Sequence, residues 1–349
     1  MAFRDLREFI AALEEAGQLK RIRVPVDPIL EVAEITDRVS KRGGPALLFE
    51  QVKGSALPLV INAFGSPERM CLALGVKAVE EVAAELEGLL ETKAPQGLLD
   101  KLKLLPKLKD LASFFPKMVK DGPCKEVVRT ADASLDLLPV IQCWPQDAGR
   151  YITFPLVITK DPETGIRNVG TYRMQVFDGK TTAMHWHAHK GGAVHYRKAK
   201  ARGQRTPVAA VLGADPITTF SGTVPSPEGI DELMIAGFLR KEPVPLVPCE
   251  TIALEVPATA EIVLEGYVEP DELRTEGPFG DHTGFYSLAD AYPVFHLTAI
   301  THRRDPIYQT IIVGRPPMED CHMAYAIERI FLPLLRKQLP EVVDYHMPF

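Results

Sequence analysis

The amino-acid sequence predicts an α+β protein: an N-terminal α/β unit, a larger β-rich barrel or sandwich, and a closing helix. In residues 5–91, helical spacing of apolar side chains alternates with short strand-like runs. From about 126 to 315, short alternating segments follow one another, separated by turn signals such as DPETG, DGK and PSPEG. At 349 residues, the chain is long enough to form two domains.

The N-terminal elements follow from apolar spacing and stop signals. Leu6, Phe9, Ile10 and Leu13 recur at helical spacing, and Gly17 ends the run. KRIRVPV then alternates like a strand. By the same criteria, we expect helices at 5–16, 29–41, 67–74 and 77–91, and strands at 20–26, 46–52 and 57–64.

A segment rich in proline and lysine, residues 93–125, follows the N-terminal unit. Its prolines break any long helix, and its lysines favour exposure to solvent. We interpret it as a domain connection with short, solvated helices. A basic membrane-surface or anion-binding segment is the alternative.

The β-rich part contains a series of candidate strands: ITFPLVIT, NVGTYRMQVFD, TTAMHWHAH, PVAAVLG, IALEVP, AEIVLEGYVE, VFHLTAITHR and IYQTIIV. One helix, at about 228–241, interrupts them, and a last helix spans about 320–338. The expected domains are therefore an α/β domain at 1–115, a β domain at 116–318 and a C-terminal helix at 319–349.

Composition excludes several classes of protein. The net charge of -6 and pI of about 5.9 argue against a nucleic-acid-binding protein. The five cysteines lie far apart without a C-x-x-C pair, which fits a reducing cytoplasm. The charged N-terminus has no signal-peptide core, and no apolar run approaches the length of a membrane span. P-loop, dinucleotide-binding and nucleophile-elbow motifs are absent as well.

The segment MHWHAHKGG carries three histidines at alternating positions. On a strand, His185, His187 and His189 would share one face, where a metal or an anionic ligand would explain them. A solvated strand face is the alternative. Lys190 followed by Gly191 and another glycine combines a positive charge with exposed backbone, which suits a phosphate.

Two further segments and one helical residue are candidates for chemistry. In NVGTYRMQ, Arg173 lies between threonine and glutamine on its strand face, which favours a binding strand over a core strand; a surface arginine in an ion pair is the alternative. In TEGPFGDHTGFY, Glu276 and Asp281 flank a tight turn, and paired carboxylates can separate their pKa values so that one delivers a proton. Solvated loop carboxylates are the alternative. Glu232 lies beside apolar residues near a helix N-terminus.

Together, NVGTYRMQ, HWHAHKGG, VPATAEIVLEGYV, EGPFGDHTG and VGRPPMED resemble the UbiD family of prenylated-FMN-dependent decarboxylases, enzymes like 4-hydroxy-3-polyprenylbenzoate decarboxylase. The resemblance covers essentially the whole chain, with the motifs in the family's order. It implies a split β-barrel flavin-binding domain after the α/β domain. It also implies the reversible, non-oxidative decarboxylation of an aromatic or α,β-unsaturated acid, in quinone biosynthesis or aromatic acid metabolism.

The resemblance implies specific ligands and catalytic residues. Prenylated FMN would be held through a divalent metal, usually manganese, with potassium nearby, and would form a covalent adduct with the substrate. The catalytic residues would be Arg173, which attracts the substrate carboxylate, Glu276, and Asp281, which donates the proton. The metal ligands would be Asn168, His189 and Glu232. The flavin would be lined by Thr171, Tyr172, Arg173, His185, Trp186, His187, Lys190 and Gly191.

The resemblance also implies partners and a departure from the family. A flavin prenyltransferase would supply the cofactor, the chain would form a homo-oligomer, and a polyprenylated substrate would bring it to the membrane surface. Family members generally continue beyond PEVVDYHMPF, so 319–349 would begin a truncated C-terminal domain. We therefore expect weaker flavin binding and an exposed apolar surface on the final helix. The rival functions are a non-catalytic flavin-binding or scaffold protein, and a zinc hydrolase that uses the three histidines.

Overall fold

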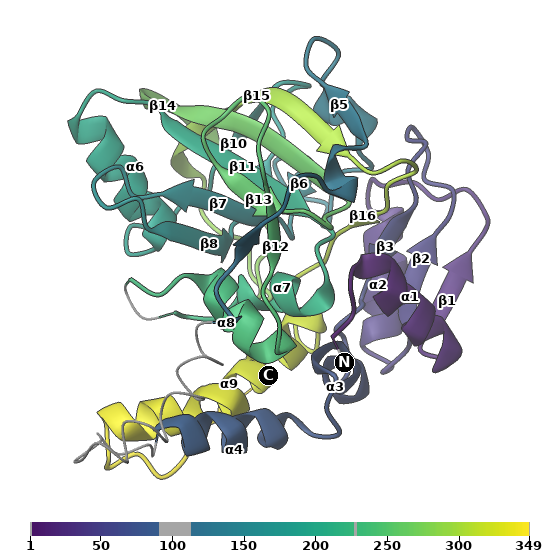
Figure 1. Ribbon diagram of the computed structural model, residues 1–349. Helices are drawn as coiled ribbons and strands as arrows, with labels where there is room; N and C mark the ends of the chain where they lie inside the picture. Colours follow the sequence, from purple (N-terminus) through teal and green to yellow (C-terminus); the bar gives the residue numbers. More distant parts are fainter. Residues whose placement is uncertain (1, 91–112, 227–228, 349) are drawn as a thin grey trace.

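The computed structural model describes residues 2–90, 113–226 and 229–348. It has a small N-terminal α/β part, a large central sheet and a long helical pair along one side (Figure 1). The predicted linker helices at 93–112 lie outside the described residues. None of the described helices is long and apolar enough to cross a membrane.

The N-terminal part is built as the sequence predicts. In helix α1 (Leu6–Glu15), Asp5 caps the first turn by accepting the Glu8 N–H, and the four apolar residues at helical spacing are buried. The other helices here are α2 (Glu31–Ser40), α3 (Pro67–Leu74) and α4 (Val79–Leu90). The strands are β1 (Leu19–Ile22), β2 (Ala46–Phe49) and β3 (Leu59–Ile61), shorter than the alternating patterns that predict them.

A late strand completes the N-terminal sheet. Its order is β1-β2-β3-β16, and β16 (Tyr308–Gln309) runs parallel to β3. The segment before the last helix therefore returns to the first hundred residues. The sheet thus joins β16, near the end of the chain, to strands that lie within its first hundred residues.

The central sheet has the order β10-β15-β14-β11-β7-β8, with β5 paired to β15. Neighbours on this path are antiparallel, as in a β meander or Greek key. Its strands are β5 (Val127–Arg129), β7 (Leu156–Lys160), β8 (Arg167–Thr171), β10 (Thr181–Ala183), β11 (Thr206–Leu212), β14 (Ile262–Glu276) and β15 (Asp290–His302). Among the described residues β8 and β10 do not pair, so the fold is a mixed α/β fold with an open sheet and not a closed barrel.

Shorter strands and helices surround this sheet. Two small sheets are β4 (Lys117–Met118) with β12 (Pro245–Pro248) and β13 (Glu255–Pro257), and β6 (Tyr151–Ile152) with β9 (Met174–Gln175). Short 3₁₀ helices span Pro123–Lys125 and Leu135–Leu137. The helices are α6 (Gly191–Ala201), α7 (Pro216–Ser221), α8 (Glu232–Arg240) and α9 (Glu319–Gln338), and α9 packs against α4 (Figure 1).

The sequence-based strand assignment is wrong in the histidine segment. Strand β10 ends at Ala183 because its pairing with β15 ends there, and the three histidines follow in irregular backbone. The Gly191-Gly192 pair that follows Lys190 opens helix α6. The histidines therefore do not share one strand face.

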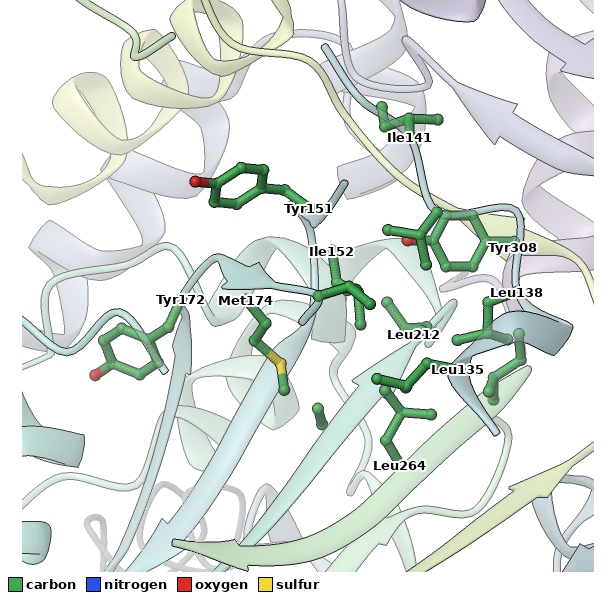
Figure 2. Close-up of a cluster of buried hydrophobic side chains, with 14 of the residues drawn as sticks. Leu135, Leu138, Ile141, Tyr151, Ile152, Tyr172, Met174, Leu212, Leu264 and Tyr308 are labelled. Atoms are coloured by element: carbon green, nitrogen blue, oxygen red, sulfur yellow. The ribbon is translucent and has the colours of Figure 1, made fainter. Parts of the chain in front are cut away.

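The predicted strand at 168–178 is also interrupted. Residues 167–171 pair with β7, whereas Met174 and Gln175 pair with β6, and the backbone leaves the sheet at Tyr172 and Arg173. This change of pairing partner makes room for Arg173 to point away from the ladder. A buried cluster that includes Tyr151, Met174, Leu212 and Leu264 packs beside this break (Figure 2).

The last helix, α9, does not carry the exposed apolar surface that the sequence analysis expects. Its large apolar side chains are buried or half-buried, against α4 and the N-terminal part. The exposed apolar residues follow the helix instead, at Leu339, Val343 and Met347. The expected apolar surface thus lies on the segment after α9.

Candidate active site

Arg173 is the centre of a network of charged side chains. Its Nε donates to Glu276 Oε1 over 2.8 Å, and its Nη2 donates to Oε2 over 3.2 Å. Its Nη1 donates to Asp281 Oδ2 over 2.9 Å. The guanidinium therefore holds both carboxylates at once, one of them through the two-bond geometry that arginine favours. The fold thus brings Arg173, which lies at the break between β8 and β9, against Glu276 and Asp281, which lie at the two ends of the EGPFGD motif.

Glu276 is the last residue of β14, and its side chain is fully buried. His185 Nδ1 lies 3.0 Å from Glu276 Oε2, opposite the arginine. Burial by itself raises the pKa of Glu276, but the hydrogen bonds from His185 and Arg173 outweigh it and hold the pKa below its ordinary value. Glu276 is therefore a fixed negative charge at the base of the site.

Asp281 is more open than Glu276, with 28% of its side chain exposed. Burial raises the pKa of Asp281, but the bonds from His282 to Oδ1 and the charge of Arg173 lower it further than burial raises it. Asp281 can thus exchange with solvent, whereas Glu276 cannot. The two carboxylates differ in exposure, but the pKa of each is lowered, so the expected separation of their pKa values is not present in this structure.

Two side chains that the sequence analysis did not single out complete the arrangement around Arg173. The guanidinium carbon lies 4.5 Å from the centre of the Phe279 ring, a cation–π contact. Ser287 Oγ accepts from Arg173 Nη2 over 3.2 Å. Phe279 lies inside the EGPFGD motif, so its position was a usable signal. Ser287 carries no local signal, because only the hairpin at 280–286 returns it to the arginine.

The histidines lie beside this network. His185 is buried and stacks on the Tyr292 ring with centroids 4.3 Å apart, and its Nε2 lies 3.1 Å from Nε2 of exposed His187. Burial, together with the charges of His185 and Arg173, lowers the pKa of His187. His189 lies in the exposed turn before α6. The structure thus brings His185 and His187 together and sets His189 apart.

The N-terminus of α6 forms a cradle for an anion. Gly191 and Gly192 open this helix, and a Cβ on Gly192 would lie 2.6 Å from Trp186 Nε1. Trp186 Nε1 is buried and has no hydrogen-bond partner among the described residues; Thr171 Oγ1 is also buried and unpaired, but it lies against Gly222. A buried polar group without a partner costs about 1–3 kcal/mol. Unpaired polar groups around a helix N-terminus fit a phosphate group.

A carboxylate and an amide lie next to this cradle. Glu232, at the start of α8, accepts the Val169 N–H over 2.8 Å and the Ser226 hydroxyl over 2.5 Å. Burial raises the pKa of Glu232, against these two bonds. Asn168 precedes Val169, and its amide oxygen occupies the space of a Gly191 Cβ, at 1.9 Å. Asn168 and Glu232 thus lie at the mouth of α6, where oxygen ligands suit a hard divalent cation.

The histidine-based zinc site finds no support in this geometry. Within the described residues, no three His, Cys, Asp or Glu side chains gather closely enough to hold a metal. His185 and His187 instead bond to each other, and His185 also bonds to Glu276. Their environment is that of a hydrogen-bonded relay.

Family models account for most of the chain. Residues 117–316 match the 3-octaprenyl-4-hydroxybenzoate carboxy-lyase Rift-related domain, and residues 10–86 match the N-terminal domain of the same enzymes. The chain belongs to the UbiD family. It is therefore a carboxy-lyase of the UbiD class, as its motifs predict.

Known relatives agree with this assignment. An uncharacterised protein of Archaeoglobus fulgidus is 56% identical over 349 residues, which cover 100% of this chain and 72% of the relative. The UbiD-class enzyme HmfF from Pelotomaculum thermopropionicum, in an evolved dimeric form with prFMN, matches with 33% identity and a TM-score of 0.85. That match covers 99% of this chain and 76% of HmfF. Vanillic acid decarboxylase of Sedimentibacter hydroxybenzoicus matches with 32% identity and a TM-score of 0.85, over 99% and 71% of the two chains.

Proposed function

We propose that this UbiD-class enzyme decarboxylates an aromatic or α,β-unsaturated acid, with a hydroxylated benzoate as the favoured substrate. The observation that carries the proposal is the bonding of Arg173 to both Glu276 and Asp281 in one site. A guanidinium with a movable carboxylate partner can exchange that partner for a substrate carboxylate. The names of two matched structures, vanillic acid decarboxylase and 3,4-dihydroxybenzoic acid decarboxylase, support a hydroxybenzoate.

Arg173 binds the substrate carboxylate in this proposal, and Asp281 delivers the proton. Glu276 holds Nε and keeps the guanidinium oriented, while Nη1 releases Asp281 to bond the substrate. His282 lowers the pKa of Asp281 more than Arg173 does, but loss of the arginine bond removes one lowering contribution, so the pKa rises and Asp281 can take up a proton from solvent. Loss of carbon dioxide leaves an electron pair on the substrate carbon, and Asp281 protonates that carbon.

The residues around α6 fit the cofactor of the class. Prenylated FMN, when bound, supplies the electron sink for decarboxylation. Its phosphate would meet Lys190, Gly191 and the unpaired Trp186 Nε1 at the helix N-terminus. The ring side of the site would be lined by Thr171, Tyr172, Arg173, His185 and His187.

The same region fits a metal. We assign Asn168, His189 and Glu232 as ligands of a divalent ion, manganese by preference, with potassium beside it. The observation in support is that Asn168 Oδ1 lies against Gly191 at the start of α6, while Glu232 is bonded to the backbone N–H of Val169, the residue after Asn168. An ion there would join the phosphate to the protein.

The remaining features of the proposal concern organisation. We divide the chain into an N-terminal domain at 1–115, a flavin-binding domain at 116–318 with split-barrel topology, and a C-terminal helix at 319–349. The dimeric form named for the matched HmfF structure supports a homo-oligomer. A flavin prenyltransferase would supply the cofactor, and a polyprenylated benzoate substrate would place the enzyme in quinone synthesis at the membrane surface.

The test is to co-express the protein with a flavin prenyltransferase and to identify released small molecules by absorption and mass spectrometry. We expect prenylated FMN together with manganese, and carbon dioxide release from hydroxybenzoates. Zinc without a flavin, or bound flavin without turnover of any unsaturated acid, would contradict the proposal.

A further inference from the structure

The turn that carries Asp281 is held from one side by a separate segment of the chain. Phe279 and Asp281 both contact Arg173, and Gly280 lies between them. The backbone at Gly280 therefore sets the position of both contacts. The neighbouring segment 143–151 lies about 130 residues earlier in the chain and bonds to this turn at Gly280 and at the Pro278 carbonyl.

Asp147 is the main contact in that segment. Its buried carboxylate accepts the Gly280 N–H over 2.7 Å at Oδ1. Its Oδ2 accepts the N–H of Cys143 over 3.1 Å and that of Trp144 over 2.8 Å. One carboxylate thus ties the two loops together through three backbone donors, and it donates nothing itself.

Trp144 and two other contacts support the same turn. A Cβ on Gly280 would lie 2.2 Å from Trp144 Cδ1, so the indole lies directly against the turn. Trp144 is itself fixed, because its Nε1 donates to the Val313 carbonyl over 2.8 Å. The Ala148 N–H donates to the Pro278 carbonyl over 2.9 Å.

Gln175 and Tyr151 hold the start of the turn in a similar way. The Gly277 N–H donates to Gln175 Oε1 over 2.8 Å, and the Tyr151 hydroxyl donates to the same oxygen over 3.1 Å. Figure 2 shows that Tyr151 points to a different side from Ile152, its neighbour on β6. These bonds fix Gly277, and Asp147 fixes Gly280 next to the reacting carboxylate.

We propose that Asp147 is a positioning residue for proton delivery, which holds the Gly280 peptide so that Asp281 reaches the substrate carbon. The inference rests on the proposed role of Asp281. Proton transfer requires heavy atoms within hydrogen-bond reach, and a displacement of about 1 Å can cost about 100-fold in rate. Asp147 is buried and its carboxylate already accepts three backbone N–H bonds, so we assign it a role through Gly280 and Asp281 and no direct contact with the substrate.

The test compares Asp147→Ala and Asp147→Asn with Asp132→Asn. Asp132 is an exposed aspartate paired with Arg129, so it is a matched control on the same stretch of chain. Asparagine keeps one acceptor oxygen and replaces the other by a donor, whereas alanine removes both. For each variant we would measure bound flavin, kcat, KM and the ratio of kcat in H₂O to kcat in D₂O.

We expect kcat to fall about 100-fold in Asp147→Ala and roughly 10-fold in Asp147→Asn, because proton delivery becomes rate-limiting. The solvent isotope ratio should rise in both variants, while KM and bound flavin stay within about twofold. Asp132→Asn should match the wild type. A fall in flavin content and thermal stability with an unchanged isotope ratio would assign Asp147 a structural role only and would overturn the proposal.

Amide hydrogen exchange separates this inference from the proposed function. In protein without flavin, the peptide covering 277–285 should exchange faster in both Asp147 variants than in the wild type. Unchanged exchange would overturn the positioning role. Asp281→Asn is measured in parallel. Suppose that Asp281→Asn retained full turnover while the peptide 277–285 exchanged faster in the Asp147 variants. Asp281 would then not be the proton donor, and the proposed role of Asp147 in proton delivery would also be wrong.

Discussion

The imidazole of His185 bridges Glu276 and His187: its Nδ1 lies 3.0 Å from the Glu276 carboxylate, and its Nε2 lies 3.1 Å from His187 Nε2. Two facing Nε2 atoms can share one proton only, so one ring donates and the other accepts. Because Glu276 also binds Arg173, one hydrogen-bond network joins the two histidines to the arginine.

Asp281→Asn should abolish turnover and leave flavin bound. Asparagine keeps the shape and can still accept from Arg173, but it has no acidic proton to deliver. The measurement is carbon dioxide release together with the flavin content of the purified variant. Turnover within about threefold of the wild type would remove Asp281 from the mechanism.

Gly191→Ala should weaken flavin and manganese binding. A Cβ at this position would lie 1.9 Å from Asn168 Oδ1, so the amide must move away from the mouth of α6. Bound flavin and metal can be measured by absorbance and elemental analysis. Gly88→Ala in α4 is the control, because its Cβ would meet nothing within 4 Å. Equal loss in both variants would attribute the effect to helix stability.

Glu276→Gln should make the free energy of unfolding less dependent on pH in the acid range. The pKa of Glu276 is held below 4.5 in the folded protein, so its bonds stabilise the fold at pH values above 4.5. That stabilisation is lost as the pH falls through the depressed pKa. The glutamine variant leaves Asp281 as the charged partner of Arg173, so the cost near neutral pH should be smaller than the about 3–5 kcal/mol of a fully broken buried pair.

Urea unfolding at several pH values measures this difference. The gap in unfolding free energy between wild type and Glu276→Gln should narrow as the pH falls below 4.5 and through the lowered pKa of Glu276. Glu269→Gln, which changes a surface carboxylate paired with Arg205, provides the control. A gap that stays constant with pH would show that the carboxylate's charge contributes nothing to the fold.

Glu319→Gln should stabilise the protein at alkaline pH. Complete burial raises the pKa of Glu319 from 4.5 to about 7, although the Phe64 N–H donates to its Oε1. A raised folded pKa means that its contribution is fully present below about 4.5 and is lost as the pH rises through 7. Glutamine carries no charge at any pH and removes this loss, which amounts to at most roughly 3 kcal/mol.

Thermal unfolding of the wild type and Glu319→Gln on either side of neutral pH checks this expectation. The two proteins should be similar in acid, and the variant should unfold at a higher temperature above about pH 8. Buried Arg69 lies within reach of the Glu319 charge. If the variant instead lost stability at high pH, a Glu319–Arg69 ion pair would outweigh the burial of the carboxylate.

Much of the molecule was predictable from local signals. Helix α1 follows from four apolar residues at helical spacing and the Asp5 cap, and the candidate carboxylates follow from the dense turn chemistry between Glu276 and Asp281. These features depend on neighbours within a few residues, which a single sequence contains.

Other parts of the site could not be predicted in this way. The three histidines satisfied a strand pattern, but β10 pairs with β15 only from Thr181 to Ala183. Pairing length depends on the partner strand, about 110 residues away, and not on the alternation of the segment itself. The role of Asp147 was hidden for a similar reason, since it binds a turn 133 residues further along.

The sequence by itself determined the types of side chain available: an arginine, two carboxylates around a tight turn, and a positive residue before two glycines. Apolar spacing and turn propensity are local properties, so they can be recognised in the amino-acid sequence alone. Only the tertiary structure decided which side chains meet. Arg173 finds Glu276 and Asp281 because its backbone leaves one ladder at Tyr172 and enters another at Met174, and the geometry of that change is set by packing between distant strands.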